Sequence, residues 1–216
     1  MFTGIVQETG KVSKVERKSD LVTLEFACPG IRPGLNPGDS VAIDGCDLTV
    51  TSLTVSGFTA DATRETLSLT TLGELSQGTV VNLEPSLTPT TPISGHFVLG
   101  HIDGVGVVSS LNHGHDQAEL IVQPPEDLLK FIARKGSITV SGVGLTVVNV
   151  YSDAFTCWIV PYTLKHTTIA SFKSGTRVNL EVDVLARYVI RGLEMGIKPE
   201  LSGGITEEFL REHGFG

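Results

Sequence analysis

The chain has 216 residues, enough for one large domain or for two small domains of about 100 residues each. Its 24 acidic against 16 basic residues give a formal net charge of −8, which argues against nucleic acid as a partner because polyanion binding needs positive charge. No apolar run approaches the roughly 18 to 20 residues of a membrane span, and the start "MFTGIVQETG" lacks the pattern of a signal peptide. We therefore expect a cytoplasmic protein with no membrane partner.

Cysteine and histidine usage gives little indication of a metal site. The three cysteines, Cys28, Cys46 and Cys157, cannot all pair and show no CxxC spacing, so neither a disulfide nor a zinc site is expected. His113 and His115 lie in "LNHGHDQ", a composition typical of a solvated hairpin turn. We predict that the protein holds no metal.

An internal repeat organises the chain. "DGCDLTV" at 44–50 matches "SGVGLTV" at 141–147, "ETLSLTTL" matches "YTLKHTTI", and "GTVVNLE" matches "GTRVNLE", each pair 97 residues apart. The opening stretches "TGIVQETGKV" and "LGHIDGVGVV" match one residue out of step. The repeat predicts two tandem domains, 1–90 and 91–187, joined by the Pro- and Thr-rich "PSLTPTTPIS".

The predicted elements inside each repeat are β-strands. β-Branched and aromatic runs broken by Gly, Asp and Ser follow one another in "LVTLEFA", "DSVAIDG" and "LTVTSLTVSGFTADA", then in "AELIVQ", "GSITVSG" and "LTVVNVYSDAFTCWIV". About six short strands per repeat predict an all-β fold, either a small closed barrel or a sandwich. Between strands, "PPEDLLKFIARKG" predicts a short helix, whereas the matching "PGIRPGLNPGD" is too rich in Pro and Gly for a regular one.

The C-terminal segment, 184–216, is predicted to be helical. "DVLARYVIRGLEMG" carries apolar residues at helical spacing over 184–193, and such a face needs a surface to bury against. That surface is either the chain's own barrel or other copies of the chain. "GITEEFLREHGFG" predicts a final short helix with Thr206 as N-cap and with Glu207 and Glu208 in its first turn.

These motifs together resemble the riboflavin synthase and lumazine-binding protein family. The resemblance is carried by "MFTGIV", by "GHFVLGHIDG", by both "G-x-x-LTV" phrases and by both "VNLE" strands, and it covers residues 1–190. It implies that each repeat is a six-stranded Greek-key barrel binding one 6,7-dimethyl-8-ribityllumazine. It also implies a homotrimer held by C-terminal helices, with active sites between the first barrel of one subunit and the second barrel of a neighbour. The implied reaction is a dismutation of two lumazines to riboflavin that needs no cofactor.

The resemblance also assigns site residues. It implies substrate-binding roles for eight positions: Gly4, Ile5, Val6, Thr49, Thr66, Lys135, Thr146 and Thr163. It places catalytic positions at Asp47, His101, Ser141, Gly144 and Asp183.

Three of the catalytic positions depart from the family pattern, which usually has Cys at 47, Asp at 141 and Ser at 144. Cys46 is one residue away from the missing thiol and would point to the opposite face of a strand, so we expect it to pack inside the barrel. Three hypotheses stay open. The chain is a synthase with altered proton-transfer groups, in which Asp47 can serve as the base, or a non-catalytic protein that holds a lumazine or flavin. The third is a related enzyme acting on a modified pteridine or flavin precursor.

Overall fold

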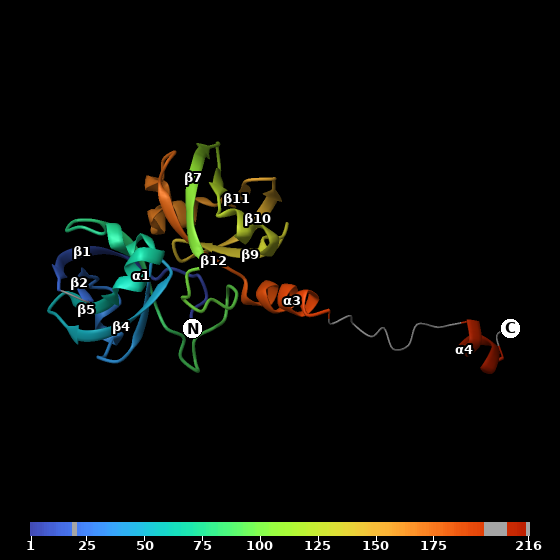
Figure 1. Ribbon diagram of the computed structural model, residues 1–216. Coiled ribbons are helices and arrows are strands. Elements are labelled where there is room, and N and C mark those ends of the chain that lie inside the picture. The colour runs from blue at the N-terminus through green and yellow to red at the C-terminus, as the bar shows by residue number, and fades with distance from the viewer. Residues whose placement is uncertain (19–20, 197–206, 215–216) are drawn as a thin grey trace.

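The computed structural model describes residues 1–18, 21–196 and 207–214. It consists of two closed antiparallel β-barrels of six strands each, lying side by side (Figure 1). The first barrel contains β1 (Glu8–Arg17), β2 (Leu21–Ala27), β3 (Ser40–Ile43), β4 (Cys46–Leu53), β5 (Gly57–Thr63) and β6 (Val80–Pro85). The second contains β7 (Gly104–His113), β8 (Ala118–Gln123), β9 (Ser137–Val140), β10 (Val143–Val150), β11 (Phe155–Ile159) and β12 (Arg177–Val182).

The two barrels share one strand order. Around the first the order is β1-β2-β5-β4-β3-β6, and the second repeats it as β7-β8-β11-β10-β9-β12. The all-β prediction is confirmed, and of its two alternatives the structure has closed barrels. His113 ends β7 in a hairpin whose turn is closed by a hydrogen bond from the Gly114 N–H to the Gln117 carbonyl, as the sequence predicted.

Strand alternation decides which side chains reach the outer surface of the barrel. Along β4, Cys46, Leu48 and Val50 are buried in the barrel core, while Asp47 and Thr49 point outward. The prediction that Cys46 packs inside the barrel is therefore confirmed. Burial raises the pKa of its thiol to about 12, which suits a packing residue rather than a nucleophile.

The helical segments between the strands are short. They are α1 (Arg64–Leu69) and α2 (Pro161–His166), with 3-10 turns η1 (Arg32–Gly34), η2 (Thr71–Glu74), η3 (Glu126–Phe131) and η4 (Thr168–Ser171). The helix predicted within 124–136 is η3, a 3-10 segment of six residues. Its counterpart η1 has only three residues, in keeping with the Pro- and Gly-rich sequence there.

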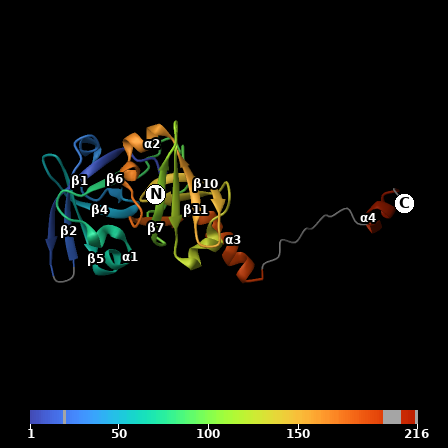
Figure 2. The same ribbon diagram turned by 90° about the horizontal axis from the view of Figure 1, so that it is seen from above.

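The barrels meet at two tight turns, one between β3 and β4 and the other between β9 and β10. The Asn82 side chain of β6 donates to the carbonyl of Ser141 (2.8 Å), and the Asn179 side chain of β12 donates to the carbonyl of Asp44 (2.9 Å). Each barrel thus holds the turn of the other. Seen from above, the N-terminus lies between the two barrels (Figure 2).

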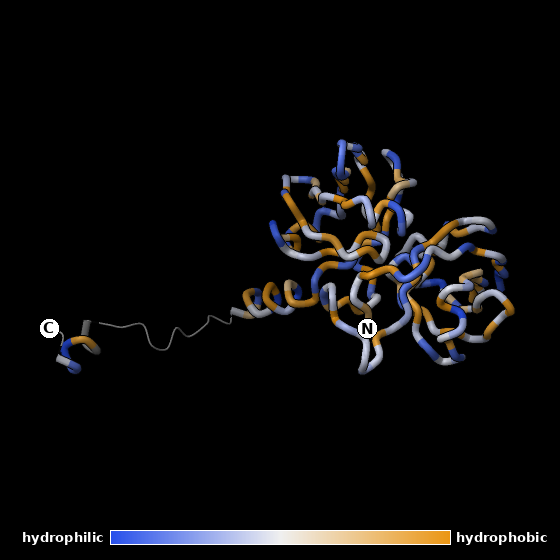
Figure 3. Tube along the Cα trace, turned by 180° about the vertical axis from the view of Figure 1, so that it is seen from behind, coloured by the Kyte–Doolittle hydropathy of each residue, from blue (hydrophilic) through white to orange (hydrophobic). Residues whose placement is uncertain are grey.

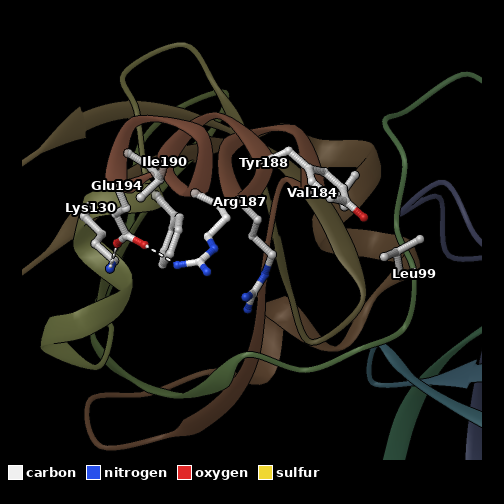
Figure 4. Close-up of a pocket in the computed structure, with 9 residues that line it drawn as sticks. Leu99, Lys130, Val184, Arg187, Tyr188, Ile190 and Glu194 are labelled. Carbon is white, nitrogen blue, oxygen red and sulfur yellow. Dashed lines mark hydrogen bonds and ion pairs between the residues drawn. The ribbon is translucent and has the colours of Figure 1, made fainter. Parts of the chain in front are cut away.

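The helix α3 (Val184–Glu194) follows the second barrel and is capped by the Asp183 carboxylate, which accepts the N–H of Leu185 at 2.9 Å. One side of α3 is tied to its own barrel. Arg187 pairs with Asp103. Lys130 of η3 pairs with Glu194 at 3.1 Å (Figure 4).

The apolar side of α3 is exposed. Leu185, Val189 and Leu193 are each about 60% accessible, and Figure 3 shows apolar residues recurring along this helix. Of the two predicted burial surfaces, the chain's own barrel therefore does not cover this face. The last helix described is α4 (Glu207–Glu212), and its predicted N-cap Thr206 lies outside the described residues. None of the helices in the described ranges has the length and apolar character needed to cross a membrane.

Candidate functional site

The outward faces of β4 and β10 carry equivalent positions in the two barrels. Asp47 and Thr49 occupy this face on β4, and Gly144 and Thr146 occupy it on β10. Both threonines are exposed, so their hydroxyls are available to a ligand lying on the barrel surface.

A pocket of about 230 Å³ lies beside Asp47 on the first barrel. Its walls come from β4, from α1 and from the opening segment of the second repeat: Cys46, Asp47, Glu65, Thr66, Leu69, Thr70, Gly100, His101 and Ile102. The pocket brings together Asp47, Thr66 and His101, which are far apart in the sequence and to which the resemblance assigns catalytic or substrate-binding roles.

The opening segment of each repeat crosses to the other barrel. Gly100 accepts a hydrogen bond from the N–H of Asp47 at 3.0 Å, and Ile102 packs against the core of the first barrel. In the mirror arrangement, Gly4 accepts from the N–H of Gly144 at 2.8 Å, and Val6 packs against the core of the second barrel. The opening segment of each repeat thus forms part of the surface of the other barrel. In the second barrel this places Gly4 and Val6 beside Gly144.

Two buried glutamates hold these opening segments. Glu84 of β6 accepts the N–H and the hydroxyl of Thr3, both at 2.7 Å, and the N–H of Gly4 at 3.0 Å. Glu181 of β12 accepts the N–H groups of Leu99 (2.6 Å) and Gly100 (2.9 Å). Burial raises the pKa of both carboxyl groups, that of Glu181 to about 7. Sequence reasoning missed both residues, although each is the last letter of a matched "VNLE" phrase.

Asp47 has an unusual environment for a carboxylate. Its side chain is half-buried, and within the part of the chain that the structure describes its buried Oδ1 has no hydrogen-bond partner. A buried acceptor without a donor costs about 1–3 kcal/mol. Gly100 lies close beside Asp47: a Cβ added at Gly100 would lie 2.6 Å from the Asp47 Cβ. Asp47 is therefore not the freely solvated strand-end carboxylate that an ordinary surface position would have.

The equivalent surface of the second barrel differs in charge and shape. Gly144 stands where the first barrel has Asp47, and Tyr162 and His166 of α2 stand where it has Glu65 and Leu69. The Tyr162 ring stacks on the His166 ring with centroids 4.0 Å apart. The first surface thus carries two acidic side chains, and the second carries an aromatic pair.

The remaining predicted residues lie at separate places in the fold. Ser141 is buried in the turn between the barrels, and its carbonyl receives the Asn82 side chain. Lys135 is exposed in a tight turn with a φ of 66° and donates its N–H to Val147 at 2.8 Å. Asp183 caps α3. Ile5 is exposed next to Gly4, and Thr163 is half-buried on α2 at the position equivalent to Thr66.

Larger hollows lie away from Asp47. One of about 410 Å³ separates α3 from the second barrel between Phe131, Arg187 and Leu99 (Figure 4), but its charged groups Lys130, Arg187 and Glu194 engage one another or Asp103. In the described ranges, no cluster of three or more His, Cys, Asp or Glu side chains is placed to hold a metal ion.

Comparison with known proteins gives the family. A family model described as lumazine binding domain matches twice, over residues 3–86 and 99–183. The riboflavin synthase of Photobacterium phosphoreum is 38% identical over 216 residues, covering 100% of this chain and 99% of its own. That of Mycobacterium bovis is 40% identical over 195 residues, covering 88% and 97%.

Among solved structures, LumP complexed with 6,7-dimethyl-8-(1'-D-ribityl) lumazine has a TM-score of 0.77 at 25% identity, covering 84% of this chain and 99% of its own. LumP complexed with riboflavin has a TM-score of 0.78 at 26% identity over the same shares. The doubled barrel, the doubled family match and the full-length relatives agree, and the chain belongs to the riboflavin synthase and lumazine-binding protein family.

Proposed function

We propose that this chain is a riboflavin synthase that binds one 6,7-dimethyl-8-ribityllumazine on each barrel and converts two of them to riboflavin and a ribitylamino-pyrimidinedione. The observation that carries the proposal is the duplicated site, in which an outward strand face, a short helix and a crossing opening segment recur on both barrels. A reaction between two identical molecules needs two such sites. Relatives named riboflavin synthase, 34–40% identical over most or all of the chain, support it.

The proposed reaction moves a four-carbon unit from one lumazine to the other and consumes no further reactant. One ring loses a proton from its C7 methyl group and attacks the second ring, so the protein must orient two rings and transfer protons. We assign the ribityl contacts to the hydroxyls of Thr49, Thr66, Thr146 and Thr163. Proton transfer in the first site is assigned to His101, which lines one pocket with Asp47.

Assembly through α3 is part of the proposal. The exposed side chains of Leu185, Tyr188, Val189 and Leu193 form one apolar stripe, which a second and third copy would bury. A homotrimer joined by these stripes would bring the first barrel of one copy against the second barrel of its neighbour, and so bring two lumazines face to face.

A second candidate is a protein that holds a lumazine or flavin without converting it. Gly144 lacks any side chain that can polarise a bound ring, and Asp47 places a negative charge where an anion must form. The LumP complexes show the same fold with lumazine and riboflavin bound to a relative. An enzyme that acts on a modified pteridine is a third form of the proposal, since ring substituents would be read by pocket shape.

The duplicated site is tested by counting ligands. Fluorescence titration with 6,7-dimethyl-8-ribityllumazine should give two molecules bound per chain. Thr66→Trp and Thr163→Trp should each reduce this number to one and abolish turnover, whereas Ser152→Trp, in the exposed turn between β10 and β11, should change neither. One ligand per chain in the parent, or unchanged binding in both threonine variants, would contradict the two-site arrangement.

A further inference from the structure

The opening segment of each repeat is held by a glutamate of its own barrel. The same segment forms part of the surface of the other barrel. Thr3 and Gly4 hydrogen bond to Glu84 of the first barrel, yet the carbonyl of Gly4 accepts from Gly144 of the second barrel. Gly4 has a φ of 79°, and a Cβ there would lie 2.8 Å from the Gly144 backbone, so a glycine is what lets the segment approach β10 this closely.

The second repeat shows the same connection reversed. Leu99 and Gly100 hydrogen bond to Glu181 of the second barrel, and the carbonyl of Gly100 accepts from Asp47 of the first barrel. Gly100 has a φ of 82°, and a Cβ there would lie 2.6 Å from the Asp47 Cβ and 3.0 Å from its amide nitrogen. Glu84 and Glu181 occupy the same place in the repeat, 97 residues apart.

A carboxylate suits this position for a geometric reason. Two successive backbone N–H groups converge on one side chain, as they do in the concavities that bind anions. The two carboxylate oxygens of Glu84 accept different donors. Oε1 accepts the N–H and the hydroxyl of Thr3, and Oε2 accepts the N–H of Gly4. A glutamine of the same size would turn an NH₂ donor toward one of these donors and would move the segment.

We propose that Glu84 and Glu181 are positioning residues that act across the barrel boundary, Glu84 on the second-barrel site through Gly4 and Glu181 on the first-barrel site through Gly100. The inference rests on the proposed function in that each barrel surface is taken to bind a ring. Each carboxylate fixes the position of the opening segment that lines the site on the other barrel. A change at one glutamate should therefore alter ligand affinity at only one of the two sites.

The test uses variants in which one site is blocked, with riboflavin as the probe and fluorescence quenching as the readout, which needs no turnover. With Thr66→Trp only the second site remains, and there Glu84→Gln should weaken riboflavin binding at least about tenfold, while Glu181→Gln changes it less than about twofold. With Thr163→Trp only the first site remains. There Glu181→Gln should weaken riboflavin binding at least about tenfold, while Glu84→Gln should change it less than about twofold.

A matched control separates positioning from general structure. Glu8 also accepts two successive backbone N–H groups, those of Gly30 (3.2 Å) and Ile31 (2.9 Å), but in a loop outside both sites. Glu8→Gln should leave riboflavin binding at both sites within about twofold of the parent. Equal losses at both sites from Glu84→Gln, or a loss on the same barrel as the mutated glutamate, would overturn the proposal.

Two further measurements cover the cases in which riboflavin binding cannot be compared. If the parent binds no riboflavin, the proposed function fails, and the positions of the opening segments are measured from amide resonances instead. Glu84→Gln should then shift the Gly144 amide resonance and Glu181→Gln the Asp47 amide resonance, and the positioning proposal is overturned if neither resonance moves. If Glu84→Gln does not fold, Thr3→Val removes one of the three donors to Glu84 and should weaken only the second site, by a smaller factor. Weakening of the first site by Thr3→Val would overturn the proposal.

Discussion

The amide N–H of Gly144 donates a hydrogen bond of 2.8 Å to the carbonyl oxygen of Gly4, and this contact joins the start of the chain to the second barrel. Gly4→Ala should weaken it, because the new Cβ would lie 2.8 Å from the Gly144 backbone. We expect the free energy of unfolding to fall by at least about 2 kcal/mol in total. A left-handed backbone at a non-glycine residue alone costs ~1–2 kcal/mol, and the close contact should add to that cost.

The control for this prediction is Gly175→Ala. Gly175 has a similar φ of 87°, but a Cβ there meets nothing within 4 Å. Urea unfolding followed by the fluorescence of Trp158, the single tryptophan, compares the two variants. Equal losses of stability would show that the Gly4–Gly144 approach contributes nothing beyond the backbone conformation.

Asp47→Cys should raise both stability and turnover. The change removes a buried oxygen that has no hydrogen-bond partner among the described residues, and removes a negative charge from beside a lumazine that must become an anion. We expect at least about a tenfold rise in kcat, equivalent to a barrier about 1.4 kcal/mol lower, with affinity little altered. Adding Gly144→Ser should keep this gain, although its Cβ would lie a tight 3.2 Å from the Gly4 carbonyl oxygen.

The control for Asp47→Cys is Glu65→Gln, which removes the other acidic side chain of the same pocket. Glu65 is exposed, so solvent screens its charge and turnover should change little. A fall in kcat for Asp47→Cys would mean that Asp47 is the base and that the chain uses its own scheme of proton transfer.

Cys46→Ala should leave turnover within about twofold of the parent while reducing stability by about 1 kcal/mol, since it deletes one buried heavy atom. The side chain lies in the first barrel's core, and burial holds the pKa of its thiol near 12. Steady-state kinetics and urea unfolding measure the two effects. A loss of turnover larger than the loss of folded protein would assign Cys46 a chemical role.

The double change Val189→Glu and Leu193→Glu should abolish self-association. Both side chains are about 60% exposed on α3, and charged groups there cannot be buried against another copy without a large penalty. Sedimentation velocity should show trimers for the parent and monomers for the variant, with turnover lost in parallel. Val55→Glu, at a fully exposed apolar residue of the first barrel, should remain trimeric.

Stability should fall as pH rises through the titration of Glu181. Burial raises the pKa of this carboxyl group from 4.5 to about 7, so the folded chain binds the proton more tightly than the unfolded chain. The resulting stabilisation is complete below about pH 4.5 and is lost as the pH rises through about 7. Glu181→Gln should therefore lose less stability between about pH 5 and pH 8 than the parent, as measured by urea unfolding. Asp116→Asn, on an exposed turn, should follow the parent.

Much of the fold could be predicted because the two repeats constrain each other. Matched phrases 97 residues apart make β4 equivalent to β10 and β6 equivalent to β12. Strand alternation puts Cys46 and Asp47 on opposite faces of β4. Site roles for Thr66, His101 and Asp47 came only from the family resemblance, and the closed fold is what brings the three residues into one pocket.

The crossing of the opening segments could not be read from the sequence. A repeat shows that two units are alike, but it does not show which barrel each segment packs against, since this depends on contacts between the units. The roles of Glu84 and Glu181 follow from that crossing. The turn positions of Ser141 and Lys135 were also hidden, because a left-handed φ at a non-glycine residue leaves no pattern in the sequence.

Turnover is measured directly as the product yield from purified protein incubated with 6,7-dimethyl-8-ribityllumazine. Riboflavin is followed by its absorbance and the ribitylamino-pyrimidinedione by chromatography. We expect one riboflavin and one pyrimidinedione for every two lumazines consumed, with no added cofactor. Saturated binding of lumazine with no riboflavin formed would contradict it and would leave a protein that holds the ligand without converting it.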